Sequence, residues 1–440
     1  MNTFQAVATF LSVISGVLLL AALLQTLYLF ALALASTHSH SVKPSQNPQN
    51  RFAIVIPAHN EDTVIANTVR RLRELDYPSN LFDVHIVADH CTDQTVQFAD
   101  EAGAIVHARS DGPRSGKGAA LSWLIARILG APKDASRPYS AVVIFDADTR
   151  VAPDFLRIMD ARLAQGDLVV QGQHRISNPK DGLFPALTHA MFLIDNRFQN
   201  QGRTNLGLSA KIMGDSICFH ADILRKLGWG EGLTEDYQLR LRLLLNGMRV
   251  VYEPAAIGKG EAARTWKQAR AQRARWLTGT HNASQEFAQP LLRQGLQHRS
   301  WAMLDGALQT RSLSFSTLAL LSIAWLVIQV LMNGIAAYFH TTTPVFNIVI
   351  ERLWIATSAL LFAYPLFGLA LEKAPLSAYL SIILAGPLYI FWRTQLALSS
   401  RHSKKPINWV RTEHGKKREE NQTQPSVSQI LFSKHEPSSE

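Results

Sequence analysis

Two carboxylates follow an apolar run in the middle of the chain. Residues 141–145 read AVVIF and lead directly into Asp146-Ala147-Asp148. Such a run is typical of a buried parallel strand, and open α/β sheets bind ligands at the carboxyl ends of their strands. Carboxylate oxygens suit Mg²⁺ or Mn²⁺, so the pair predicts a divalent cation held against a diphosphate. The alternative is a strand-end turn with two solvated acids, because such a pair also arises by chance.

Strands and helices alternate around this pair, which predicts an α/β, Rossmann-like domain with a mostly parallel sheet and nucleotide-binding topology. Apolar runs predict strands over 52–57, 84–89, 104–108, 141–145, 168–174 and 249–253. Helical patterns cover 63–75, 94–102, 117–129, 183–203, 237–246 and 262–280. We expect Asp93 to cap the second of these helices.

Long apolar segments at both ends indicate a membrane protein. Val7–Ser36 is 30 residues without a charge, twice the length of a signal core, and predicts an uncleaved anchor. Leu313–Phe339 and Leu353–Leu371 are each long enough to span. Leu376–Trp392 has only 17 residues and contains a proline, so we expect it to be interfacial or re-entrant. A further crossing would put the basic tail outside, against the positive-inside rule.

These features divide the chain into six expected parts. They are a transmembrane anchor (1–36), a linker (37–51), the catalytic domain (52–282), an interfacial helical region (283–312), further transmembrane segments (313–400) and a basic cytoplasmic tail (401–440). The net charge of +10 is concentrated beside the membrane segments, with seven Lys or Arg in 401–420. No basic recognition helix accompanies it, which argues against nucleic-acid binding. Two cysteines exclude a disulfide framework.

Further polar motifs occur in a fixed order along the chain: Pro57-Ala58-His59-Asn60-Glu61, Asp89, Gly116-Lys117-Gly118, the Asp146 pair, Thr234-Glu235-Asp236 and Gln272-x-x-Arg275-Trp276. Together they resemble the membrane-bound family 2 glycosyltransferases with a GT-A fold, such as cellulose, hyaluronan and chitin synthases. The wording is nearest to the exopolysaccharide-biosynthesis branch. The resemblance covers about residues 52–282. Residues 213–219 read MGDSICF where cellulose synthases carry Phe-Cys-Gly-Ser on the acceptor side.

The resemblance implies roles on the donor side. It places Pro57, Asn60 and Glu61 in the first loop around the nucleotide, and Asp89 at the uracil of a UDP-sugar. Lys117 would lie near the nucleotide phosphates. The alternative for Lys117 is an ordinary surface lysine in the first turn of a helix.

The resemblance also assigns the metal and the chemistry. Asp148 would bind the metal, Mg²⁺ or Mn²⁺, and Asp146 the ribose or the metal. Asp236 would be the general base, with Glu235 assisting at the acceptor. A hydroxyl attacks well only as a carboxylate removes its proton, and one base without a carboxylate nucleophile means single displacement with inversion. The alternative for Asp236 is a helix cap.

The last motif would also bind substrate, through Gln272, Arg275 and Trp276. Arg275 would meet the diphosphate and Trp276 would stack on the acceptor sugar. Alternatively, Arg273 and Arg275 form a solvated basic face and Trp276 is a membrane-interface anchor.

The sequence thus predicts an inverting, metal-dependent hexosyltransferase that extends a polysaccharide from a UDP-sugar. The rival is a single transfer onto a lipid-linked acceptor, and a non-catalytic assembly subunit is a third candidate. We expect a multi-pass protein of the cytoplasmic membrane with a cytosolic catalytic domain. Export or assembly subunits are possible partners.

Overall fold

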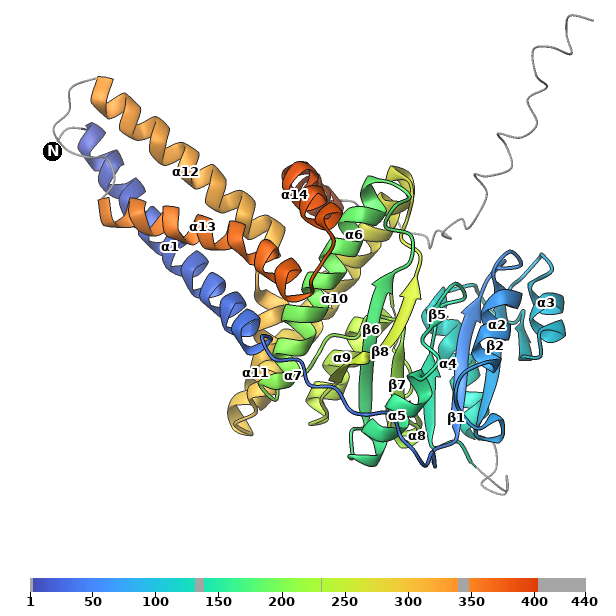
Figure 1. Cartoon of the computed structure of the whole chain (residues 1–440). Coiled ribbons are helices and arrows are strands. Elements are labelled where there is room, and N and C mark those ends of the chain that lie inside the picture. Colours follow the sequence, from blue (N-terminus) through green and yellow to red (C-terminus); the bar gives the residue numbers. More distant parts are fainter. Residues whose placement is uncertain (1–2, 131–137, 231, 339–347, 403–440) are drawn as a thin grey trace, which may run out of the picture. The chain divides into compact units, whose positions relative to one another are not determined.

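A computed structural model describes residues 3–130, 138–230, 232–338 and 348–402, and in these residues one eight-stranded sheet lies between helices (Figure 1). Its strands are β1 (Phe52–Ala58), β2 (Phe82–Asp89), β3 (Ile105–Arg109), β4 (Ala141–Ile144), β5 (Arg150–Val151), β6 (Val169–Ile176), β7 (Ile217–His220) and β8 (Val251–Gly260). The strand order is β3-β2-β1-β4-β7-β6-β8-β5. The predicted strands are therefore present, most of them within two residues of their expected bounds.

The sheet changes character at β4. From β3 to β4 neighbouring strands are parallel, so the carboxyl ends of β1, β2 and β4 meet at one edge. Strand β7 is antiparallel to both β4 and β6, with Ile144 opposite Ile217, while β6 and β8 are again parallel. Because β7 runs opposite to β4, the residues just before β7 lie at the same edge of the sheet as the carboxyl end of β4.

Helices cover both faces of the sheet, which explains the continuous apolar runs of its central strands. On one face lie α2 (Ile65–Arg73), α3 (Thr95–Glu101) and α5 (Phe155–Ala164). On the other lie α4 (Lys117–Gly130), α8 (Ala221–Leu227) and α9 (Glu235–Leu245). Alternate residues of β1 divide between the two cores: Phe52, Ile54 and Ile56 face the first and Ala53 and Val55 the second.

The helix expected over 183–203 is interrupted. It consists of α6 (Leu183–Ile194), a π-helical segment η2 (Asp195–Gln201) and the single turn α7 (Gly202–Asn205). A Cβ on Gly202 would lie 2.3 Å from the carbonyl oxygen of Leu32, so only glycine allows this close contact with the N-terminal helix α1 (Thr3–Ala35). The helix expected over 262–280 is longer, since α10 spans Trp266–Gln297 and is followed by α11 (Trp301–Arg311).

Four helices in the described residues are long and apolar enough to cross a membrane. Three match expected spans: α1, α12 (Phe315–Tyr338) and α13 (Ile348–Leu371). The fourth, α14 (Leu376–His402), is longer than predicted. Its apolar segment covers the 24 residues Leu376–Ser399, whereas the predicted apolar run had only 17 residues and was therefore expected to be interfacial or re-entrant. The helix continues past Trp392 while Arg393 donates to the Ser316 hydroxyl of α12 at 3.4 Å. Residues 403–440 of the expected tail lie outside the described residues.

The expected linker 37–51 lies along the sheet domain. The Val42 amide donates to a Glu253 carboxylate oxygen at 3.2 Å, and the Ser45 amide to the Arg157 carbonyl at 3.0 Å. Both cysteines are free thiols, and Cys218 is buried in the core.

Candidate active site

The predicted carboxylate pair lies where β4 ends. Asp146 accepts a hydrogen bond from the Lys117 ammonium, and its side chain is 42% exposed. One oxygen of Asp148 accepts the backbone amide of Glu261 at 2.7 Å. The strand end therefore presents two acids that are fixed by different parts of the chain, Lys117 at the start of α4 and Glu261 after β8.

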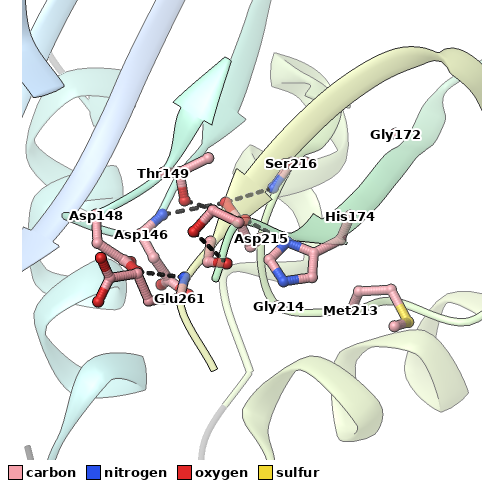
Figure 2. A network of polar contacts seen from close by, with 12 residues as sticks. Asp146, Asp148, Thr149, Gly172, His174, Met213, Gly214, Asp215, Ser216 and Glu261 are labelled. Atoms are coloured by element: carbon pink, nitrogen blue, oxygen red, sulfur yellow. Dashed lines mark hydrogen bonds and ion pairs between the residues drawn. The ribbon is translucent and has the colours of Figure 1, made fainter. Parts of the chain in front are cut away.

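A third acid, Asp215, lies between Asp146 and His174 (Figure 2). It is 1% exposed and accepts hydrogen bonds from the Asp146 amide at 3.1 Å and the His174 ring at 2.6 Å. Burial opposes ionisation of the Asp215 carboxyl, but the hydrogen bond and charge of His174, the charge of Lys117 and the Asp146 amide together outweigh it and lower its pKa. No role was predicted for Asp215 or His174 from the sequence. Residues 213–219 were singled out only for their departure from Phe-Cys-Gly-Ser, which predicted no role for Asp215.

The predicted acceptor-side acids open helix α9. Glu235 is 5% exposed, and burial, then the charge of Asp236, raises its pKa to about 7. Burial also raises the pKa of Asp236, while the amide of Tyr237, which donates to it at 2.8 Å, acts in the opposite direction. The N-cap of α9 is Thr234, so Asp236 is not the N-cap residue. Its carboxylate satisfies one first-turn amide and remains half-buried.

Lys117 connects the two sides of the site. Besides Asp146, its ammonium donates to the Gly214 carbonyl at 2.5 Å. A Cβ on Gly214 would lie 3.0 Å from a carboxylate oxygen of Asp236 and 3.9 Å from the Lys117 nitrogen. Burial opposes the charge of Lys117, but Asp146 and Glu235 outweigh it and raise its pKa. The structure thus gives Lys117 close partners, unlike an ordinary surface lysine.

Two glycines make room for Glu235. A Cβ on Gly118 would lie 3.0 Å from its side chain, and a Cβ on Gly230 would lie 2.0 Å from its carbonyl oxygen. Residues larger than glycine at these positions would displace the start of α9 away from Lys117.

The first loop follows β1 and contacts the end of β2. Asn60 adopts a left-handed conformation, with φ of 58°, and its side-chain oxygen accepts the Thr92 amide at 2.8 Å. The amide of Glu61 donates to the Thr95 hydroxyl at 2.7 Å. Pro57 is the penultimate residue of β1. The predicted first-loop residues are thus brought beside the loop that follows Asp89.

The carboxylate of Asp89, at the end of β2, is enclosed. It is bound by the Arg109 guanidinium at 2.5 Å and the His90 ring at 3.0 Å. Its role at a uracil base stays a prediction. Asp93, expected to cap α3, lies one residue before its N-cap, Gln94, and its carboxylate accepts the Thr95 amide at 3.0 Å where the helix begins.

The last motif lies on α10. The Arg275 guanidinium donates to the Leu233 carbonyl at 3.3 Å, just before α9. Arg273 is buried, and its guanidinium lies 4.4 Å from the centre of the Trp276 ring. The Arg273 side chain therefore does not form a solvated face. Gln272 occupies the preceding position of α10 and is half-buried.

The residues present fit a divalent cation only in part. Asp146 and Asp148 offer the hard oxygen ligands that Mg²⁺ and Mn²⁺ prefer. Among the described residues, no three His, Cys, Asp or Glu side chains converge as a complete metal site. A cation held by two carboxylates would complete its coordination with water and the phosphates of a donor, which is the usual arrangement for Mg²⁺.

Comparison with known proteins gives the family. Residues 48–279 match the family profile described as glycosyltransferase like family 2. The beta-monoglucosyldiacylglycerol synthase of Trichormus variabilis is 29% identical over 279 residues, covering 60% of this chain and 56% of that protein. The cellulose synthase catalytic subunit of Xanthomonas axonopodis pv. citri is 26% identical over 262 residues, covering 56% and 33%.

The chain spans about half the length of the Trichormus protein (56%) and a third of the Xanthomonas protein (33%). Among solved structures, a similar one is the mannosyltransferase PcManGT from Pyrobaculum calidifontis in complex with GDP-Man and Mn²⁺. The match covers 83% of this chain and 99% of PcManGT, with 18% sequence identity and a TM-score of 0.49. The family match and the observed sheet confirm the expected α/β fold and a glycosyltransferase. The chain belongs to glycosyltransferase family 2.

Proposed function

We propose that this chain transfers a sugar from a UDP-sugar to a hydroxyl group of an acceptor at the membrane, by single displacement with inversion. The observation that carries the proposal is the arrangement around Lys117. Its ammonium binds Asp146 and lies beside Glu235 and Asp236, which are held in a setting that raises their pKa values. Transfer of a sugar from a diphosphate to an alcohol needs a positive charge near the leaving diphosphate and a carboxylate that accepts the proton of the alcohol, and this cluster holds both.

In the proposed reaction, the acceptor oxygen bonds to the anomeric carbon while the bond from that carbon to the diphosphate breaks. Asp236 takes the hydroxyl proton, because a carboxylate with a raised pKa is a stronger base than an ordinary one. Lys117 and Arg275 would offset the negative charge that develops on the leaving diphosphate. Glu235 would orient the acceptor, and Trp276 would stack on its sugar ring.

Asp148, with Asp146, would hold Mg²⁺ or Mn²⁺. When bound, the cation supplies positive charge to the leaving diphosphate. The first loop, with Pro57, Asn60 and Glu61, would enclose the nucleotide.

Two acceptors are compatible with this chemistry. The first is a growing polysaccharide, as the resemblance to exopolysaccharide synthases implies. The second is a membrane lipid that receives a single sugar, and the relatives named as beta-monoglucosyldiacylglycerol synthases favour it. The candidate membrane helix α14 packs against α6 and α10 (Figure 1), and α10 carries Arg275 and Trp276. Either acceptor would therefore approach these residues from the membrane side. Donor sugars are cytosolic, so we place the catalytic domain in the cytosol, at the cytoplasmic membrane.

The test uses the full chain purified in detergent. Release of nucleotide is measured with UDP-glucose, UDP-GlcNAc, UDP-galactose and GDP-mannose, and the products are then sized after incubation with the preferred donor and membrane lipids. We expect a uridine donor to be preferred. A ladder of products would identify polysaccharide extension, and one lipid-soluble product would identify a lipid acceptor. Nucleotide release at the rate of a heat-treated sample for all four donors would overturn the proposal.

A further inference from the structure

The Asp215 carboxylate joins three segments: the loop Asp146–Thr149, strand β6 with His174, and its own turn, residues 213–216 (Figure 2). One oxygen of Asp215 accepts the amides of Asp146 at 3.1 Å and Ser216 at 2.7 Å. The other accepts the Thr149 hydroxyl at 3.1 Å and Nδ1 of His174 at 2.6 Å. At 1% exposure the carboxylate has no surface left for a substrate, so any influence on the reaction passes through these partners.

The register of the sheet explains this meeting. Strands β4 and β7 are antiparallel, with Ile144 opposite Ile217. Continued by two residues, this pairing sets Asp146 opposite Asp215. Strand β6 pairs with the other side of β7 and carries His174 two residues before its end. A carboxylate at this point can reach a donor on each side.

The turn that carries Asp215 is itself firmly held. The buried Gln171 side chain accepts the Met213 amide at 2.9 Å and donates to the Asp215 carbonyl at 2.8 Å. Ser216 has a φ of 56°, which is rare for a residue with a side chain. A Cβ on Gly258 would lie 1.9 Å from the Ser216 hydroxyl oxygen, so β8 requires glycine at this contact. Backbone in an unusual conformation persists where its surroundings determine it, and it is frequent near functional sites.

We propose that Asp215 and His174 form a positioning pair that sets the loop Asp146–Thr149 in the arrangement that binds the metal and diphosphate of the donor. The pair fixes both ends of the loop, through the Asp146 amide and the Thr149 hydroxyl. This inference rests on the proposed function. It also gives neighbouring residues of the turn 213–216 different roles. Gly214 contacts Lys117 and lies beside Asp236, whereas Asp215 binds the loop Asp146–Thr149.

Asp160 offers a matched control. It is 2% exposed and its carboxylate also accepts several hydrogen bonds, among them the Asn50 amide at 2.9 Å and the Tyr77 hydroxyl at 3.0 Å. It lies on α5, and none of its recorded partners belongs to the strand-end loop. Asp160→Asn and Asp215→Asn therefore make the same chemical change in two buried networks, of which only one contacts the loop.

The experiment measures UDP affinity of the full chain by calorimetry, first with excess Mn²⁺ and then with excess chelator, together with thermal unfolding. We expect Asp215→Asn to weaken the Mn²⁺-supported affinity by about 10- to 100-fold, the usual effect of losing a residue that orients metal ligands. Affinity in chelator should not change. Asp160→Asn should lower the unfolding temperature but leave the Mn²⁺-supported affinity within about twofold, because distant sites act independently.

A second pair of variants covers the case in which Asp215→Asn does not fold. His174→Phe keeps a ring, which the neighbouring Phe192 ring at 5.2 Å can accommodate, but removes the donor to Asp215. His174→Asn keeps a donor. We expect the first to lose about 10-fold or more of the Mn²⁺-supported affinity and the second to retain most of it. Wild-type affinity in folded Asp215→Asn or His174→Phe would overturn the positioning pair alone. UDP affinity independent of Mn²⁺ in the unaltered chain would overturn the proposed metal role and the pair with it.

Discussion

The two sides of the candidate site hold their acids in opposite ways. On the donor side, Asp146 is 42% exposed at the end of a strand and is paired with a lysine ammonium. On the acceptor side, Glu235 is 5% exposed, and burial raises the pKa values of both Glu235 and Asp236. The first setting leaves a carboxylate within reach of cations, and the second favours a carboxylate that binds a proton.

This difference follows from local structure. The acids after β4 extend beyond the sheet edge, where water and donor phosphates can reach them. Glu235 of α9 is enclosed, because Gly118 and Gly230 allow neighbouring segments to approach it closely. Two acidic motifs that look alike in the sequence are thereby given different chemistry, so that removing one should abolish donor activation and removing the other should abolish proton transfer.

The largest expected effect is loss of the donor-side cation. We predict that excess chelator reduces sugar transfer to background, and that Asp148→Ala does the same with metal present, because the leaving diphosphate then keeps its full charge. The measurement is nucleotide release over a range of Mg²⁺ and Mn²⁺ concentrations. Asp222→Ala, which removes an exposed acid on α8, serves as control and should keep wild-type transfer. Full activity in chelator would show that the donor side works through Lys117 and Arg275 alone.

The next effect is on the acceptor side. We predict that Asp236→Asn lowers the transfer rate by about 10² to 10⁴, the usual contribution of a general base, and leaves UDP affinity intact. Asp222→Asn is the control, since Asp222 also lies in the first turn of a helix. If Asp236 merely stabilised the helix terminus, both variants would lose about 1 kcal/mol of stability and retain turnover. Transfer within about threefold of wild type in Asp236→Asn would assign the base to Glu235 instead.

Much of the fold could be predicted from the sequence. The apolar run before Asp146 and the alternation around it gave the central parallel strands, because strands buried on both faces need continuous apolar residues. The return of β7 between β4 and β6 was not predicted, since the run from Lys211 to Phe219 carries no periodicity that specifies direction. The full length of α14 was also missed, because Arg393 ended the apolar run while the helix continued.

The site was predicted chiefly from the resemblance to family 2 glycosyltransferases, which assigned Lys117, Asp146 and Asp236 to one site. The structure brings these three residues together. Asp215 and His174 were not expected, because their meeting depends on the register of β4, β7 and β6, which no local pattern encodes. The raised pKa of Glu235 could not be predicted either, since it comes from burial by distant segments.

The comparison can be sharpened by pH. Because the pKa of Glu235 is raised to about 7, the acid pair gains a proton as pH falls below that value, and we predict that transfer declines with it. Glu235→Gln removes the negative charge beside Asp236, so the decline should move to lower pH. The measurement is the transfer rate at saturating donor across the pH range. An unchanged profile would mean that the pair does not limit the reaction, and loss of transfer at every pH would make Glu235 the base.

The smallest effect concerns packing on the acceptor side. A Cβ on Gly279 of α10 would lie 2.6 Å from the Thr234 side chain, directly before Glu235. Gly279→Ala should therefore push α10 away from the start of α9 and cost about 1 to 3 kcal/mol of unfolding free energy, as overpacking usually does. Since Trp276, which would stack on the acceptor sugar, lies one turn earlier on the same helix, the KM for acceptor should rise by a larger factor than UDP affinity falls through the displacement of Arg275.

Gly130→Ala is the matched control, because a Cβ at the end of α4 would meet nothing within 4 Å. This variant should have wild-type stability and kinetics. If Gly279→Ala instead weakened UDP binding as much as acceptor binding, α10 would serve both sides of the site. The separation between a donor side built on strands and an acceptor side built on helices would then be wrong at α10, which would bind the diphosphate through Arg275 as firmly as it binds the acceptor through Trp276.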